Sequence, residues 1–247
     1  MTKQLNLKVL IIIIVAALLT CIIYAVLRTD KKNYLALGDS IARGVSPHGG
    51  EMYSYNDYVV EYLRSKNALN NYYRDFAISD LRTNDLINMI QDNYVLWVKD
   101  KKITIQQALA KANIITVSVG SYDLYNHLGI TNGGERIKSH EGLNRYFRSM
   151  FTDLDNLLKT IKKYTTGRII VLGFYNPKID SDEDLDSIFR FIDSSYATVA
   201  EKNGCDYISL NEDISKNLEF LPNMDNIHMN YKGHKLISEK IIKLLRI

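Results

Sequence analysis

Cysteine and proline are scarce in this chain of 247 residues, which contains only two cysteines and three prolines. Cys21 lies inside a long apolar run and Cys205 is the only other cysteine, so no disulfide bond is expected within the rest of the chain. No long stretch rich in proline, glycine or serine divides the sequence, and no internal repeat is present. With 46% hydrophobic residues, the composition is typical of one sizeable globular domain.

An excess of basic residues is also absent from most of the chain. The net charge is +3, but five lysines and arginines and only one acidic residue lie within residues 1–32. The remainder is nearly neutral with interspersed charges, which argues against nucleic acid as a partner. His127, His140 and His234 have no metal-ligand spacing with cysteines or paired acids, so the sequence predicts no metal site.

The one long hydrophobic run lies near the N-terminus. Residues 9–27 contain no charged side chain and are rich in isoleucine, leucine, valine and alanine. As a helix they would be roughly 28 Å long, close to the thickness of the hydrocarbon core of a bilayer. The sequence therefore predicts one N-terminal transmembrane helix, with residues 1–32 as the membrane anchor and its flanks and residues 33–247 as the folded domain.

The charges beside this run give no clear orientation, because lysines and arginines both precede and follow it. A cleaved signal peptide is the alternative, but it would need a shorter apolar region and small residues at a cleavage site, to which residues 22–27 are a poor match. The favoured interpretation is an uncleaved, single-pass signal anchor in the cell membrane, with the folded domain outside the cell. A domain held at the inner membrane face stays open as an alternative.

Beyond residue 32, apolar runs typical of strands alternate with helical patterns. The expected strands are Tyr34–Leu37, Tyr72–Ala77, Ile114–Val119, Arg168–Gly173 and Tyr207–Leu210. The expected helices are Asp57–Leu69, Thr83–Lys99, Ile105–Ala112, Leu143–Tyr164, Leu185–Lys202 and Tyr231–Leu245. This alternation predicts an α/β fold, a three-layer α/β/α domain with a doubly wound parallel sheet. Ligands of such sheets bind beyond the carboxyl ends of the strands, so the site is expected there.

A serine, a histidine and a carboxylate stand near the two ends of this domain. Ser40 follows the first strand in a Gly-Asp-Ser motif, and Asp225 and His228 precede the last helix in an Asp-x-x-His motif. A serine hydroxyl becomes a good nucleophile when an imidazole removes its proton, and a carboxylate orients that imidazole and supports its charge. The motifs together predict a serine hydrolase, although each alone also occurs in ordinary turns and helix caps.

With these motifs the chain resembles the SGNH, or GDSL-type, hydrolases in four ordered blocks. The blocks are Tyr34–Ile41, Ala77–Leu86, Val117–Leu124 and Asp225–His234, and the resemblance covers about residues 33–245. It implies the flavodoxin-like SGNH hydrolase fold and cleavage of carboxylic esters without a metal or a cofactor. It also implies that Ser40 is the nucleophile, His228 the general base and later acid, and Asp225 the residue that orients His228.

Two positions depart from the family pattern, and both belong to the oxyanion hole. The second block has Asp80 where glycine is usual, and the third has Tyr122 where asparagine is usual. The backbone N–H of Asp80 can still bind the oxyanion, but its carboxylate would oppose the developing negative charge unless it points away or is paired, for which Arg82 is the candidate partner. Tyr122 is expected either to donate a hydrogen bond or to form a wall of the acyl pocket.

The favoured function is serine-dependent hydrolysis of acyl or acetyl esters, by a membrane-anchored esterase or lipase, through an acyl-enzyme on Ser40. The substrate is expected to be a small-molecule or polymer-borne ester, such as an acetyl ester of a wall polymer or a small lipid ester. The altered oxyanion hole leaves a second hypothesis open, a catalytically weakened binding or scaffold protein at the cell surface. An intracellular thioesterase or lysophospholipase is a third, and the oligomeric state is not predicted.

Overall fold

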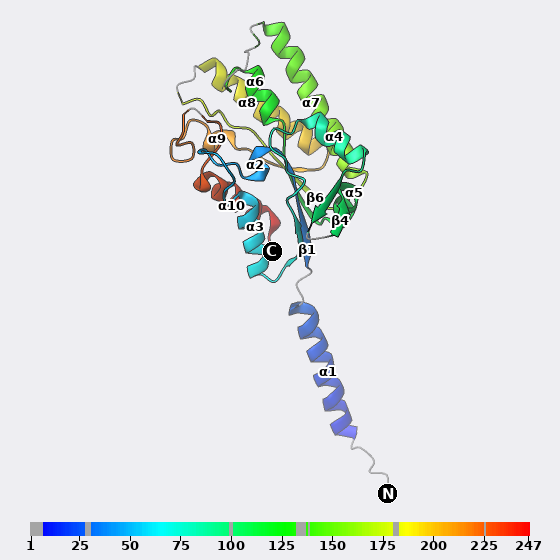
Figure 1. Cartoon of the computed structure of the whole chain (residues 1–247). Helices are drawn as coiled ribbons and strands as arrows, with labels where there is room; N and C mark the ends of the chain where they lie inside the picture. The colour runs from blue at the N-terminus through cyan, green and yellow to red at the C-terminus, as the bar shows by residue number, and fades with distance from the viewer. Residues whose placement is uncertain are drawn as a thin grey trace.

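A parallel sheet forms the centre of the computed structural model, which describes residues 7–27, 31–98, 101–131, 137, 139–179, 183–224 and 226–247. The sheet has five strands in the order β2-β1-β5-β6-β7, and all neighbouring strands are parallel (Figure 1). The strands are β1 (Lys32–Gly38), β2 (Leu69–Tyr73), β5 (Ile114–Ser118), β6 (Arg168–Leu172) and β7 (Asp206–Ile208). The first strand has neighbours on both sides, which is the order of a doubly wound, flavodoxin-like sheet. The predicted α/β fold with a parallel sheet is confirmed.

Two apolar layers cover the two faces of the sheet, because successive strand residues point to opposite sides. Leu35 and Ile115 lie in one buried cluster, and their chain neighbours Tyr34 and Ile114 lie in the other. The first cluster contains side chains of α4 (Thr83–Gln91), α5 (Ile105–Lys111), α6 (Ser121–His127), α7 (His140–Lys162) and α8 (Glu183–Lys202). The second contains side chains of α2 (Ser40–Arg43), α3 (Tyr55–Ser65), α9 (Asn211–Ile214) and α10 (Tyr231–Leu245). Figure 1 shows these two groups of helices on either side of the strands.

The helix predicted over Thr83–Lys99 is wrong in its second half. Helix α4 ends at Gln91, and Asn93 adopts a positive φ of 52°, a backbone conformation that stops a helix. The chain then forms an antiparallel hairpin of β3 (Val95–Val98) and β4 (Lys101–Thr104), outside the main sheet. The apolar run from Tyr94 fits a helical period, but its aromatic and β-branched residues favour an extended strand.

The strand predicted over Tyr72–Ala77 lies closer to the N-terminus than expected. Strand β2 ends at Tyr73, and only an isolated bridge between Ala77 and Gly38 continues the pairing with β1. The intervening turn carries the chain to the loop that contains Asp80, beside the carboxyl end of β1. The second predicted block therefore reaches the edge of the sheet as a loop.

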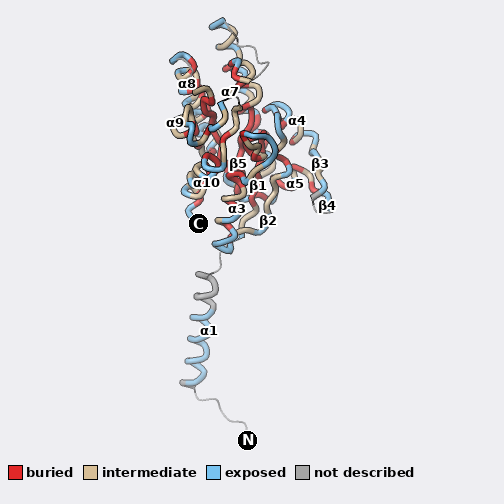
Figure 2. Tube along the Cα trace, turned by 60° about the vertical axis from the view of Figure 1, so that its left-hand side comes forward, coloured by how far each residue is buried: buried red, intermediate tan, exposed pale blue. Residues whose placement is uncertain are grey.

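The apolar N-terminal run forms helix α1 (Leu7–Leu27), of 21 residues. The side chains described on this helix, at residues 9–20, are all exposed (Figure 2). Among the residues that the structure describes, no helix combines the length and apolarity needed to cross a membrane. The transmembrane anchor over residues 9–27 therefore stays a prediction from the sequence.

Candidate active site

Ser40 is positioned by a sharp turn between β1 and α2. Gly38, the last residue of β1, has a φ of 142°, and a Cβ built there would lie 1.8 Å from the carbonyl oxygen of Ser118. This close approach allows the backbone N–H of Asp39 to donate to the same carbonyl at 2.8 Å. Ser40 then begins α2, with only 5% of its surface exposed. The turn requires glycine and places Ser40 at the carboxyl edge of the sheet, where it was predicted.

The carboxylate of Asp39 links this turn to the loop after β5. It is fully buried and accepts hydrogen bonds from the Ser121 hydroxyl at 2.6 Å, the Ser121 N–H at 3.1 Å and the Ile41 N–H at 3.1 Å. Burial raises the pKa of Asp39 to about 6, although the hydrogen bonds favour the charged form. One carboxylate thereby holds the Ser40 turn against the segment that carries Tyr122.

This buried carboxylate predicts a pH-dependent stability. Its pKa is higher in the folded state than in the unfolded chain, so its protonation stabilises the fold below pH 4, and this contribution is lost as the pH rises toward 6. We expect the free energy of unfolding of the wild type, relative to Asp39→Asn, to fall by up to about 3 kcal/mol between pH 4 and pH 7. Urea unfolding of both proteins at the two pH values measures this difference. An unchanged difference would contradict the assignment to Asp39.

His228 has one ring nitrogen bound and one unbound. Its Nδ1 lies 2.6 Å from Oδ1 of Asn226, and the same oxygen accepts the backbone N–H of His228 at 2.9 Å. Because Oδ1 of Asn226 accepts the backbone N–H, it can only accept from Nδ1 as well. In the neutral ring Nδ1 therefore carries the proton, and Nε2 holds a lone pair. Burial lowers the pKa of His228, which keeps the ring neutral at pH 7, while the charge of Asp80 opposes this shift.

Nε2 of His228 is buried and has no hydrogen-bond partner in the described part of the chain. The predicted hydrogen bond between Ser40 and Nε2 is therefore not formed in this structure. Asp225, predicted to orient His228, lies outside the described residues. The orienting contact that the structure describes comes from Asn226, a residue that the sequence analysis did not single out.

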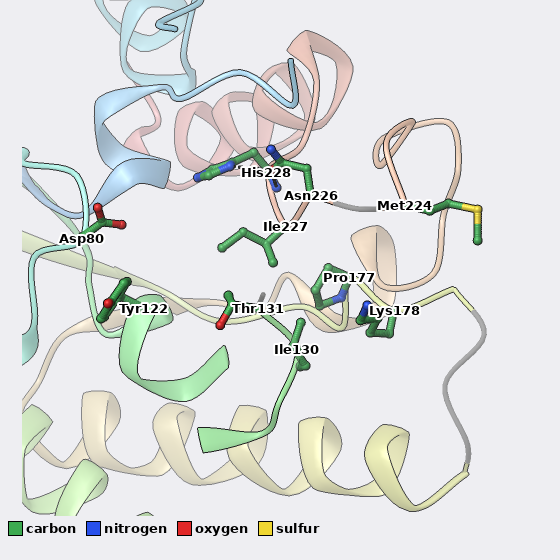
Figure 3. A pocket seen from close by; sticks show the side chains of 10 residues that line it. All are labelled: Asp80, Tyr122, Ile130, Thr131, Pro177, Lys178, Met224, Asn226, Ile227 and His228. Atoms are coloured by element: carbon green, nitrogen blue, oxygen red, sulfur yellow. Dashed lines mark hydrogen bonds between the residues drawn. The ribbon is translucent and has the colours of Figure 1, made fainter. Parts of the chain in front are cut away.

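A pocket of about 220 Å³ opens beside His228 (Figure 3). It is lined by Asp80, Tyr122, Ile130, Thr131, Pro177, Lys178, Met224, Asn226, Ile227 and His228. These residues come from the segments after β2, β5 and β6 and from the segment before α10. The predicted residues Asp80, Tyr122 and His228 are thus brought to one cavity by three separate parts of the chain. No cluster of three or more potential metal ligands occurs among the described residues.

Comparison with known families gives a match to the GDSL-like Lipase/Acylhydrolase family over residues 36–236. The chain belongs to this family. The GDSL-like domain supports the predicted SGNH-type hydrolase and identifies the protein as an ester-hydrolysing enzyme, which favours the esterase over the binding or scaffold protein. A comparison with curated protein sequences finds no match.

Solved structures share the fold of this GDSL-like domain. A lipase from a goat rumen metagenome has a TM-score of 0.69 and 20% identity, covering 86% of this chain and 97% of its own. An acetylxylan esterase from Geobacillus stearothermophilus has a TM-score of 0.61 and 14% identity, covering 87% and 94%. An α/β hydrolase from the metagenome of Lake Arreo, Spain, has a TM-score of 0.60 and 16% identity, covering 88% and 96%.

Asp80 occupies the position at which the GDSL-type pattern has glycine. Its φ of 61° lies in the left-handed region, which glycine favours and which aspartate tolerates better than most residues. The residue is exposed at the edge of the pocket, and its side chain makes no hydrogen bond or ion pair within the described part of the chain. The backbone therefore keeps the glycine-like conformation, while an unpaired carboxylate is added to the site.

Arg82, the candidate partner of Asp80, pairs with another residue. The Nε atom of Arg82 lies 3.3 Å from Oδ1 of Asp123, and its guanidinium stacks over the Tyr122 ring at 5.5 Å from the centroid. Asp123 and Tyr122 both belong to α6, so one helix holds this arginine. Arg82 consequently contacts the ring of Tyr122, and Tyr122 forms part of the pocket wall.

Proposed function

We propose that this enzyme hydrolyses carboxylic esters through an acyl-enzyme on Ser40. The observation that carries the proposal is the state of His228, whose Nδ1 is bound to an acceptor and whose Nε2 is an unoccupied base beside the pocket. Ser40 lies at the start of α2, at the carboxyl edge of the sheet. Contact between the Ser40 hydroxyl and Nε2 of His228 would complete the nucleophile and its base.

In this mechanism Nε2 of His228 removes the proton of Ser40 as Oγ attacks the ester carbonyl. The tetrahedral intermediate collapses, the alcohol leaves with the proton from His228, and the acyl group remains on Ser40. Water then attacks the acyl-enzyme, with His228 again taking and returning the proton. Asp225 and Asn226 orient the imidazole, and the backbone N–H of Asp80 and the hydroxyl of Tyr122 stabilise the oxyanion.

Two related structures support the roles of a serine and a histidine. Both are catalytic mutants of the acetylxylan esterase from Geobacillus stearothermophilus, one with a serine and one with a histidine replaced by alanine. These structural neighbours are named as a lipase and an acetylxylan esterase, which supports ester hydrolysis as the broad class here. Acetyl esters of wall polymers and small lipid esters are the substrates that we propose first.

Reaction of the purified protein with a fluorophosphonate probe and with p-nitrophenyl acetate tests this function. We expect release of p-nitrophenol, loss of turnover on treatment with the probe, and labelling of the peptide that contains Ser40. Folded protein that neither turns over the ester nor takes the label at Ser40 would exclude the proposed mechanism. Labelling at another serine would place the nucleophile elsewhere.

We also propose that residues 9–27 anchor the enzyme in the cell membrane with its catalytic domain outside the cell. The support is the apolar sequence itself and its helical conformation in α1. Full-length protein is expected to remain in the membrane fraction after alkaline carbonate extraction, and its domain to be cleaved by protease added to intact cells. Release by carbonate would argue against a spanning anchor, and protection from protease would place the domain at the inner face.

A further inference from the structure

Asp80 introduces a negative charge into a site that must stabilise a developing negative charge. Figure 3 shows its carboxylate and the His228 ring on the same side of the pocket. The charge of Asp80 acts on His228, since it favours the protonated form of that ring. An oxyanion formed beside Ser40 would feel the same charge as repulsion, because a carboxylate near an oxyanion raises the energy of the transition state.

Among the described residues no lysine or arginine pairs with this carboxylate, and the one cation shown to interact with it is the His228 ring once that ring is protonated. Arg82, two residues away, is held by Asp123 and the Tyr122 ring. Lys178 lines the same pocket but lies on the opposite side from Asp80 (Figure 3). The side chain of Asp80 lines the pocket and is exposed, so it is accessible to a ligand.

From this arrangement we infer that Asp80 selects esters whose acyl group carries an ammonium, such as α-aminoacyl esters, with the substrate supplying the missing positive charge. The inference rests on the proposed esterase function and names its substrate class. In an α-aminoacyl ester the ammonium is attached to the carbon next to the ester carbonyl, so it lies beside the reacting atoms. Pairing with Asp80 would bind the substrate and also cancel the repulsion between Asp80 and the oxyanion.

The apolar part of the pocket suits a small acyl group of this kind. Ile227, Ile130 and Thr131 lie between the Asp80 side and the Lys178 side in Figure 3. A short side chain such as the methyl group of alanine can lie against these residues while the ammonium faces Asp80. A neutral acyl group of the same size would fit the same space but leave Asp80 unpaired, so the charge and not the shape is expected to decide the preference.

The test compares alanine methyl ester with methyl isobutyrate, in which a methyl group replaces the ammonium. Purified full-length wild type, Asp80→Asn and Asp80→Gly are assayed for kcat/KM on both esters. The ammonium also makes its ester more reactive in itself. We therefore compare, from one protein to the next, the ratio of kcat/KM on alanine methyl ester to kcat/KM on methyl isobutyrate. We expect both substitutions to lower this ratio roughly twofold to fivefold, as for an ion pair at an exposed site.

Asp80→Gly should also raise kcat/KM on methyl isobutyrate, because the repulsion of the oxyanion is removed. Asparagine and glycine both tolerate the left-handed backbone, so folding of the variants is expected. Asp75→Asn is the matched control, since Asp75 is exposed but does not line the pocket, and its ratio should equal that of the wild type.

An unchanged ratio in both Asp80 variants, with hydrolysis of methyl isobutyrate by the wild type, would overturn the inference and leave the esterase function intact. Failure of the wild type to hydrolyse either ester or to be labelled at Ser40 would overturn both. A ratio that falls equally in Asp75→Asn would assign the effect to the overall charge of the domain and would also overturn the role of Asp80. Added salt should reduce the ratio of the wild type and not that of Asp80→Gly.

Discussion

Ser40→Ala and His228→Ala are each expected to lower kcat on p-nitrophenyl acetate by about 10⁴-fold or more, because the nucleophile and its base act as one unit. For the same reason the double variant should have nearly the same rate as each single variant. Any residual rate would come from substrate binding and the oxyanion donors. Steady-state kinetics of the three proteins, with circular dichroism to verify folding, measure this effect.

Ser65→Ala is the control for the serine substitution, because Ser65 is exposed at the end of α3. It should retain the activity of the wild type. A folded Ser40→Ala protein with more than a tenth of the wild-type rate would contradict the acyl-enzyme mechanism. Additive losses in the double variant would show that Ser40 and His228 act in separate steps.

The contributions of Asn226 and Asp225 to the orientation of His228 can be compared in the same assay. Asn226 accepts from both Nδ1 and the backbone N–H of His228, so Asn226→Ala removes the orienting contact that the structure describes. An effect mainly on kcat, with KM little changed, is expected for a residue that acts by positioning His228. Comparison with Asp225→Ala would show which of the two side chains has the larger influence.

Gly38→Ala is expected to destabilise the domain by about 4 kcal/mol or more. A Cβ at this position would lie 1.8 Å from the Ser118 carbonyl oxygen, and the φ of 142° is unfavourable for any residue with a side chain. The neighbouring strands β1 and β5 would have to separate at the point where Ser40 is held. Urea unfolding, or failure to obtain soluble protein, measures this cost.

Gly49→Ala provides a matched control for this substitution. Gly49 also has a positive φ, of 89°, but a Cβ there meets nothing within 4 Å. Only the backbone strain remains, so we expect a loss of roughly 1–2 kcal/mol. Equal losses at Gly38 and Gly49 would show that the contact with Ser118 has little weight.

The general fold could be predicted because the alternation of apolar strands and amphipathic helices is a local property of the chain. The predicted Tyr231–Leu245 agrees with the bounds of α10, and the other predicted strands and helices outside the β3–β4 hairpin agree to within a few residues. The hairpin was missed because a short apolar run such as Tyr94–Val98 fits both a helix and a strand. Its conformation depends on the left-handed turn at Asn93 and on pairing with β4.

The contacts of charged and polar groups in the site could not be predicted in the same way. Arg82 has acidic residues near it in both sequence and space, and only the packing of α6 decides that it pairs with Asp123 and not with Asp80. Asp39 was recognised as part of a motif, but its bonds to Ser121 join residues 82 positions apart. Such choices depend on distances between segments that are remote in the chain.

By itself the sequence determined the family, the parallel α/β sheet and the catalytic candidates Ser40 and His228, because these depend on local pattern and on motifs whose order along the chain can be read directly. The tertiary structure alone decided that Asn226 contacts Nδ1 of His228, that Tyr122 is supported by Arg82 and that Asp80 has no partner within the described residues. The physical reason is that hydrogen bonds and ion pairs require atoms within a few ångströms of each other, and the fold brings those atoms together from distant parts of the sequence.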